Sequence, residues 1–277
     1  MATVGELLRG AGDLPVDEAR RDAEVLLSHC LQQPRAWLYA WPEAEVAPAA
    51  ERRFVELLQL RRQGRPVAYL TGTREFWSLP LAVDEHTLIP RPETETLVEW
   101  ALELDLPADA AVVDLGTGSG AIALAVASER PLWQVLAVDA CSRALRVAAA
   151  NAAATGLQRV VLVRSDWYRA LNGRRFNLLL SNPPYIAEGD PHLDRGDVRF
   201  EPRAALVASG SGLAALRRLA AGAPAHLLDG GWLLLEHGCE QGRAVRAMLC
   251  EAGFSEITTR RDLAGRERIT GGRRHAQ

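Results

Sequence analysis

From Ala111 to the end of the chain, short apolar runs alternate with segments of helical periodicity. This alternation is typical of a parallel sheet covered by helices on both faces. Glycines at positions 156 and 253 stand where helices are expected to end, because glycine adopts the left-handed conformation that closes a helix. The predicted strands cover residues 111–115, 135–138, 160–164, 176–181, 232–236, 256–259 and 267–270. We therefore expect an α/β, doubly wound, Rossmann-like fold.

Residues 1–73 show a helical pattern, in which apolar side chains recur every three or four positions between charged ones. The pattern covers residues 16–30 and 54–61 and stops at Gly64. Thr3 and Glu6 have the spacing of a capping box, which predicts a first helix. Three aromatic residues between the helices are expected to pack in the core of this small bundle: Trp37, Tyr39 and Trp41.

The pattern changes between these two regions. Residues 76–83 are typical of a β-hairpin, and a proline-rich stretch at 88–92 leads to a helix that opens at Glu93-Thr94-Glu95, where acidic residues suit a helix N-terminus. The sequence thus predicts a helical domain at 1–73, a β-hairpin linker at 74–92 and a catalytic domain at 93–277. The basic stretch 271–274 near the end is expected to be disordered.

Composition excludes several classes of protein. The net charge of −3 gives no basic field for nucleic acid. The 4 cysteines lack the CxxC spacing of zinc sites and the density of a disulfide framework. No apolar run approaches the roughly 20 residues of a membrane span, and the N-terminus lacks the apolar core of a signal peptide. We expect a soluble, cytoplasmic protein.

A glycine-rich turn follows the first predicted strand of the sheet. Residues 114–120 read Asp-Leu-Gly-Thr-Gly-Ser-Gly, and glycines let the backbone turn sharply and approach a ligand closely. The spacing is GxGxG, which differs from the GxGxxG of dinucleotide folds, and no Walker lysine follows. The candidate cofactor-binding residues of the turn are Gly116, Thr117, Gly118, Ser119 and Gly120.

Suitable polar and aromatic side chains also follow the next two strands. Asp139 ends the second strand, where a carboxylate can accept hydrogen bonds from both ribose hydroxyls. After the third strand, Asp166 is placed to accept from an exocyclic adenine amine and Trp167 to stack on the ring. Asp114 is placed to hold the glycine turn or the amino-acid end of a ligand. Together these strand ends indicate a site for S-adenosylmethionine.

The fourth strand ends in Ser181-Asn182-Pro183-Pro184-Tyr185-Ile186. Two prolines remove two backbone donors and stiffen an extended corner at the carboxyl end of a strand, where α/β sheets bind ligands. The Asn182 side chain and the Pro183 main chain offer two carbonyl oxygens for the hydrogens of a planar –NH₂ group, and the Tyr185 ring can pack on its plane. Asn182, Pro183 and Tyr185 are the candidate catalytic residues, and Pro184 completes the candidate substrate site.

These features predict methyl transfer from S-adenosylmethionine to a planar nitrogen, leaving S-adenosylhomocysteine. Placement and oriented dipoles would accelerate it, so neither a strong base nor a metal is expected. His237 and Cys239 beside Glu236 are interpreted as structural. Residues 187–210 show no clear period and start at the catalytic corner, so we interpret them as a lid or a partner-docking segment, with a solvated charged loop as the alternative.

Several of these motifs together resemble one family, the HemK/PrmC protein-glutamine N5-methyltransferases that modify peptide chain release factors. The resemblance covers nearly the whole chain and rests on residues 67–72, 75–77, 88–95, 114–120, 181–186 and 197–202. The Asn-Pro-Pro-Tyr string alone is shared with DNA adenine methyltransferases. One departure is Asp139-Ala140-Cys141-Ser142, where relatives often have Asp-x-Ser-Pro, which affects only the local helix cap.

The resemblance implies methylation of the glutamine in the Gly-Gly-Gln loop of bacterial class 1 release factors, namely release factors 1 and 2. It implies a seven-stranded catalytic domain and a helical domain that docks the factor, in a chain expected to be a monomer. The methyl donor would bind Gly116 to Gly120, Asp139, Trp167 and Asn182, and the glutamine would bind residues 182–185. Alternatives are a ribosomal-protein glutamine methyltransferase, an adenine-N6 or guanine-N2 methyltransferase of nucleic acids, and a non-catalytic binding module.

Overall fold

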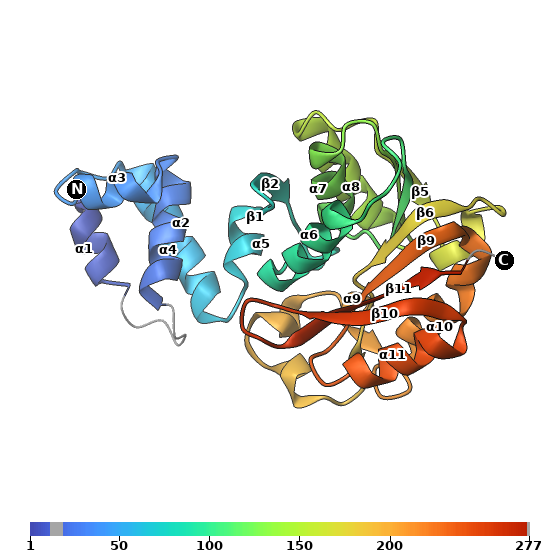
Figure 1. Ribbon diagram of the computed structural model, residues 1–277. Coiled ribbons are helices and arrows are strands. Elements are labelled where there is room, and N and C mark those ends of the chain that lie inside the picture. The colour runs from blue at the N-terminus through green and yellow to red at the C-terminus, as the bar shows by residue number, and fades with distance from the viewer. Residues whose placement is uncertain (12–18, 276–277) are drawn as a thin grey trace. The chain divides into compact units, whose positions relative to one another are not determined.

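The computed structural model describes residues 1–11 and 19–275, which form two compact units. The smaller unit holds residues 1–73 together with 194–200, and the larger unit holds residues 74–193 and 201–277. Figure 1 shows the elements of both units. Val16, which was included in the first helical pattern, lies outside the described residues.

The larger unit is built on a seven-stranded sheet in the order β10-β11-β9-β6-β3-β4-β5. Strands β3 to β6 and β9 run parallel, whereas β11 is antiparallel to both β9 and β10. The bounds are β3 Ala111–Leu115, β4 Gln134–Asp139, β5 Val161–Arg164, β6 Phe176–Ser181, β9 Leu227–Glu236, β10 Phe254–Arg261 and β11 Glu267–Arg274. All seven predicted strands are confirmed. The strand order reverses at β3, which places a ligand crevice beyond the carboxyl ends of β3 and its neighbours.

Helices cover both faces of this sheet because its central strands are apolar on both sides. In β6, Leu178 and Leu180 face one hydrophobic cluster and Leu179 faces the other. Figure 1 shows the two helical layers on opposite sides of the sheet. The first layer consists of α6 (Glu95–Glu103), α7 (Ala121–Glu129) and α8 (Ser142–Ala154), and the second of α10 (Ala214–His226) and α11 (Gly242–Glu251).

Several short elements lie outside these two helical layers. Strands β1 (Thr73–Phe76) and β2 (Leu79–Ala82) form the predicted two-stranded sheet before η1 (Pro92–Thr94). Gly156 and Gly253 follow α8 and α11 with positive φ, which confirms the two predicted helix ends. The remaining short elements are η2 Trp167–Ala170, β7 Ile186–Ala187, η3 Pro191–Asp194, η4 Gly196–Phe200, α9 Arg203–Leu206 and β8 Val207–Ala208.

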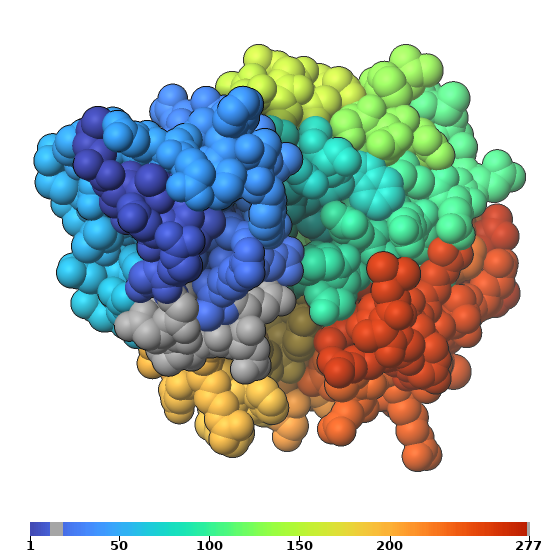
Figure 2. All heavy atoms as spheres, turned by 90° about the vertical axis from the view of Figure 1, so that its left-hand side faces the viewer, coloured from blue at the N-terminus to red at the C-terminus, as the bar shows by residue number. Residues whose placement is uncertain are grey.

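The smaller unit is helical and has its own core. Its helices are α1 Val4–Arg9, α2 Ala19–Leu31, α3 Arg35–Ala40, α4 Pro48–Arg62 and α5 Val67–Thr71. Thr3 and Glu6 form the predicted capping box at α1. Leu26, Leu27 and Phe54 are buried where α2 and α4 meet. Figure 2 shows this unit in blue to cyan.

Residues 194–200 belong to the helical unit and contact it at the end of α4. Arg61 is 6% exposed and donates to Asp22 at 2.7 Å and to Asp197 at 2.6 Å. Arg199 donates to the Gln63 carbonyl oxygen at 2.7 Å. After the Asn-Pro-Pro-Tyr string, residues 194–200 therefore belong to the helical unit. The chain returns to the larger unit at residue 201.

Two expectations were wrong. Tyr39 and Trp41 are 56% and 59% exposed, because the six-residue helix α3 turns Leu38 inward in their place. The Tyr39 hydroxyl still donates to the buried Glu24 at 2.6 Å, and Trp37 is partly buried against the helical core. Residues 271–274 are the end of strand β11 and not a disordered tail. Gly271 lies so close to Trp100 that a Cβ atom would come within 2.7 Å of the ring, so glycine serves packing there.

Candidate active site

The glycine turn between β3 and α7 is held in a conformation that requires glycine. Gly116, Gly118 and Gly120 have φ of +81°, +58° and +88°, which residues with a Cβ atom adopt only with strain. A Cβ atom on Gly116 would lie 3.1 Å from the Trp167 ring. On Gly118 it would meet no atom within 4 Å. The turn thus packs against Trp167 at one point and leaves open space at the next.

Asp114 holds this turn from behind. The carboxylate is fully buried and accepts a hydrogen bond from the Thr117 hydroxyl at 2.5 Å, and burial raises its pKa to about 7. Its second oxygen has no hydrogen-bond partner of standard geometry among the described residues, although the nearby backbone of Ala123 lowers the pKa. Asp114 does not line the adjacent cavity, so of its two predicted roles the geometry favours support of the turn.

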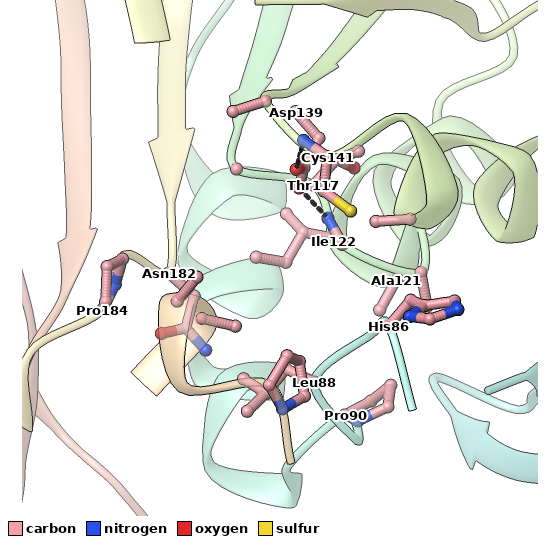
Figure 3. A pocket seen from close by; sticks show the side chains of 18 of the residues that line it. His86, Leu88, Pro90, Thr117, Ala121, Ile122, Asp139, Cys141, Asn182 and Pro184 are labelled. Carbon is pink, nitrogen blue, oxygen red and sulfur yellow. Dashed lines mark hydrogen bonds between the residues drawn. The ribbon is translucent and has the colours of Figure 1, made fainter. Parts of the chain in front are cut away.

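Asp139 lies at the end of β4, facing the same turn. Its two carboxylate oxygens accept from the backbone nitrogens of Gly118 at 2.9 Å and Cys141 at 2.8 Å, as the dashed lines in Figure 3 mark. A carboxylate oxygen has two lone pairs, so each oxygen keeps one for a further donor. The Cys141 side chain does not cap helix α8, in accordance with the departure noted in the sequence.

Asp166 and Trp167 lie beyond β5. Trp167 has a φ of +52°, an unusual conformation for a bulky residue, and its ring contacts Gly116. The Asp166 carboxylate accepts two hydrogen bonds from Arg218 of α10, at 2.9 and 2.8 Å. The sequence did not reveal Arg218 as a partner. The roles of Asp166 and Trp167 toward an adenine stay predictions.

The Asn182 corner follows β6 at the same edge of the sheet. Ser181 donates to the Leu115 carbonyl oxygen at 2.6 Å, which fixes the end of β6 against β3. The Asn182 amide nitrogen donates to the Thr94 hydroxyl at 3.2 Å. No donor in the described ranges reaches Asn182 Oδ1 or the Pro183 carbonyl oxygen, so both predicted acceptors keep their lone pairs.

Tyr185 is held at its hydroxyl group and at its backbone carbonyl oxygen. Its hydroxyl donates to Glu236 at 3.3 Å, and its carbonyl oxygen accepts from Gln241 at 2.9 Å. Burial raises the pKa of the Tyr185 hydroxyl, and the neighbouring Glu236 carboxylate raises it further. Tyr185 therefore stays a neutral donor. Its predicted packing on a planar substrate stays a prediction.

One cavity of about 270 Å³ brings most of the predicted site residues together. In Figure 3, Asp139 and Cys141 lie on one side of the cavity, and Asn182 and Pro184 lie on the other. The predicted residues that line it are Gly116, Thr117, Gly118, Ser119, Asp139, Asp166, Trp167, Asn182 and Pro184. Gly120, Pro183 and Tyr185 are not part of its wall.

Comparisons with known proteins agree over the length of the chain. The PrmC N-terminal domain model matches residues 2–72, and the methyltransferase small domain model matches residues 94–201. A release factor glutamine methyltransferase of Xylella fastidiosa is 57% identical over 92% of this chain and 93% of its own length. One of Pseudomonas aeruginosa is 52% identical over 98% of both chains.

The chain belongs to the HemK/PrmC family of release factor glutamine methyltransferases. The resemblance inferred from the motifs is thereby confirmed. The fold class is confirmed as well: a solved methyltransferase of Pyrococcus furiosus, 15% identical, matches with a TM-score of 0.55 over 82% of this chain and 98% of that one.

Several residues of the cavity wall in this HemK/PrmC chain were not predicted as site residues. His86, Leu88 and Pro90 line the cavity beside Ala121 and Ile122, as Figure 3 shows. Residues 88–92 were predicted to belong to a linker. Their proline-rich string was part of the family resemblance, and this was the signal that could have identified them as site residues. The other unpredicted wall residues are Thr94, Ala140, Cys141, Ala144, Ser165, Pro202, Ala204 and Ala205.

Within residues 1–11 and 19–275, no three His, Cys, Asp or Glu side chains gather as the ligands of a metal ion would. His237 instead contacts the Gly238 carbonyl oxygen and the Thr270 hydroxyl, which is consistent with the structural role expected for it. Within the same ranges, every helix is too short or too polar to cross a bilayer.

Proposed function

We propose that this chain transfers the methyl group of S-adenosylmethionine to the N5 side-chain amide of the glutamine in the Gly-Gly-Gln loop of release factors 1 and 2. The observation that carries the proposal is the pairing of Asn182 and Asp139 across one cavity, with the glycine turn between them. The names of the relatives support the choice of substrate.

The residues of the cavity fit the methyl donor. Asp139 keeps an acceptor on each oxygen for the two ribose hydroxyls, and Gly118 leaves open space where a Cβ atom would stand. Trp167 offers a ring face and Asp166 a carboxylate for the adenine. When bound, the donor supplies a methyl group activated by a sulfonium charge. We therefore propose that no metal ion takes part.

The Asn182 corner would orient the acceptor nitrogen. An amide nitrogen is a poor nucleophile because its lone pair is delocalised into the carbonyl group. Hydrogen bonds from its two hydrogens to Asn182 Oδ1 and the Pro183 carbonyl oxygen would fix the nitrogen and raise its electron density. As the bond from nitrogen to the methyl carbon forms and the sulfur–carbon bond breaks, one of these two protons would be released to solvent. Both acceptors are held rigidly before the substrate arrives, so placement and preorganised dipoles supply the acceleration.

The smaller unit is the proposed docking domain for the release factor. We keep the division into a docking domain at 1–73, a hairpin linker at 74–92 and a methyltransferase domain at 93–277 as part of the proposal. The exposed rings of Tyr39 and Trp41 support it, because exposed aromatic side chains are frequent at protein interfaces. A monomer in the cytoplasm, where release factors act, completes the proposal.

The test is incubation of the full chain with a radiolabelled methyl donor and purified release factor. We expect label in the factor and none in a factor whose loop glutamine is replaced by alanine. Transfer RNA and duplex DNA serve as further acceptors in parallel reactions. Equal labelling of the alanine variant, or labelling of nucleic acid alone, would contradict the proposed function.

A further inference from the structure

Glu236 is a buried carboxyl group directly beside the Asn182 corner. Strands β6 and β9 run parallel and Ser181 pairs with Leu235, so the residues that follow them, Asn182 and Glu236, lie at the same edge of the sheet. Glu236 is 1% exposed. A carboxyl group in such a position is costly unless hydrogen bonds compensate for its burial.

The donors around Glu236 come from both sides of the corner. Tyr185 donates its hydroxyl proton to Oε1 at 3.3 Å. The Thr94 and Tyr185 hydroxyls both lower the pKa of Glu236, against the rise that burial causes. The other oxygen, Oε2, has no partner in standard geometry within the described ranges. Glu236 therefore accepts from Tyr185 at Oε1 and, when ionised, offers Oε2 as an acceptor to the Thr94 hydroxyl.

This arrangement decides which way the Asn182 amide faces. The amide oxygen and nitrogen have nearly the same shape, so packing alone does not distinguish them. A hydroxyl group has one proton. When Glu236 is ionised, a Thr94 proton directed at its unpaired oxygen leaves only lone pairs toward Asn182, in agreement with the amide nitrogen of Asn182, which donates to the Thr94 hydroxyl at 3.2 Å. Oδ1 is then left for a ligand.

We propose that Glu236 and Thr94 are positioning residues for methyl transfer, which hold the Asn182 amide with its oxygen available to the acceptor nitrogen. This inference rests on the proposed function, because it explains how the acceptor oxygen of that reaction is oriented. Neither residue is required to touch the transferred methyl group. Their effect passes through Asn182.

Two substitutions in the full chain test the arrangement. Glu236→Gln can keep the hydrogen bond from Tyr185 but removes the negative charge that attracts the Thr94 proton, so that this proton can turn toward Asn182. Thr94→Val removes the hydroxyl at nearly constant volume. We expect each to lower kcat for release-factor methylation by about 10- to 100-fold, with the Kd of the methyl donor within about twofold of wild type. Thr94→Ser keeps the hydroxyl group, so its kcat should stay close to that of wild type.

A double-mutant cycle separates positioning from a general structural effect. If Glu236 acts through Asn182, Glu236→Gln has little further effect on kcat in an Asn182→Ala background. Thr270→Val is the matched control, because Thr270 is a buried threonine whose hydroxyl contacts His237 and Thr259 and lies outside the cavity wall. Its kcat should equal that of wild type.

Different results would refute the proposed function and the positioning role of Glu236 and Thr94. No labelling of the release factor by the wild-type chain would refute the proposed function itself. If the wild-type chain labels the factor, unchanged kcat in Glu236→Gln and Thr94→Val would overturn the positioning role. The same fall in kcat with and without Asn182 would overturn it too. If Glu236→Gln does not fold, the comparison of Thr94→Val with Thr94→Ser decides the question.

Discussion

The backbone nitrogen of Gly118 donates to the Asp139 carboxylate at 2.9 Å, so a single side chain fixes the glycine turn and also faces the cavity. Asp139→Ala removes this bond and both acceptors assigned to the ribose. We expect donor affinity measured by calorimetry to fall by about 10- to 100-fold, the scale of one to two charge-assisted hydrogen bonds. Asp229→Ala, at an exposed carboxylate outside the cavity wall, is the control. Unchanged binding by Asp139→Ala would contradict the ribose assignment.

Asn182→Ala should separate chemistry from donor binding. The substitution removes the side-chain acceptor for the substrate amide and leaves Asp139 and the glycine turn in place. We expect turnover to fall by about 10²–10³, the scale for the loss of one preorganised polar contact, with donor affinity mostly intact. Single-turnover assays with labelled donor and calorimetry measure the two quantities. Turnover close to that of wild type would remove Asn182 from the catalytic role.

The fold was predictable because its signals are local. Residues 111–115 and 176–181 are apolar runs that end in polar or glycine-rich turns, and such runs predict buried strands without knowledge of the neighbours. Since parallel strands bring their carboxyl ends to one edge, Asp139 and Asn182 were expected to lie near one site. Both line the same cavity.

The contacts that tune the site were not predictable, because they join residues far apart in sequence. Thr94 lies 88 positions from Asn182, and Arg218 lies 52 positions from Asp166. No spacing rule pairs such residues. Gly271 was misread for a related reason: a glycine signals flexibility locally, whereas here the nearby Trp100 ring leaves no room for a side chain.

Two alanine substitutions in the glycine turn should have different effects. Gly116→Ala combines a positive φ with a Cβ atom 3.1 Å from Trp167, whereas Gly118→Ala has a positive φ but open space. We expect Gly118→Ala to lower the free energy of unfolding by about 1–2 kcal/mol and Gly116→Ala by more. Both should weaken donor binding. Urea denaturation measures which variant is less stable. Equal stability of the two variants would contradict the contact between Gly116 and Trp167.

Arg61 should be more sensitive to substitution than its partner Asp197. Its guanidinium is buried between Asp22 and Asp197, and both carboxylates raise its pKa. Arg61→Met leaves Asp22, 13% exposed at its side chain, without this partner, and we expect the free energy of unfolding to fall by about 2–4 kcal/mol. Asp197 is 40% exposed at its side chain, so Asp197→Asn should cost less. If Asp197→Asn lowered the free energy of unfolding more than Arg61→Met, Arg61 would not be the more sensitive partner of this ion pair.

The two buried carboxyl groups predict how stability changes with pH. Burial raises the pKa of Asp114 and of Glu236 to about 7, from ordinary values of 3.8 and 4.5. Charged neighbours also act on these two pKa values. Asp139 raises the pKa of Asp114, whereas at Glu236 the pKa is lowered by Arg268 and raised by Glu93. Between the ordinary and the raised values the folded chain binds more protons than the unfolded chain.

Stability contributed by these two groups is therefore complete below about pH 4 and is lost as the pH rises through about 7. Urea denaturation between about pH 5 and pH 8 should show a decline that is shallower in the Asp114→Asn, Glu236→Gln double variant. The comparison of slopes isolates the two carboxyl groups, because the other ionisable side chains are the same in both proteins. Identical slopes would mean that neither group holds a proton in the folded chain over this range.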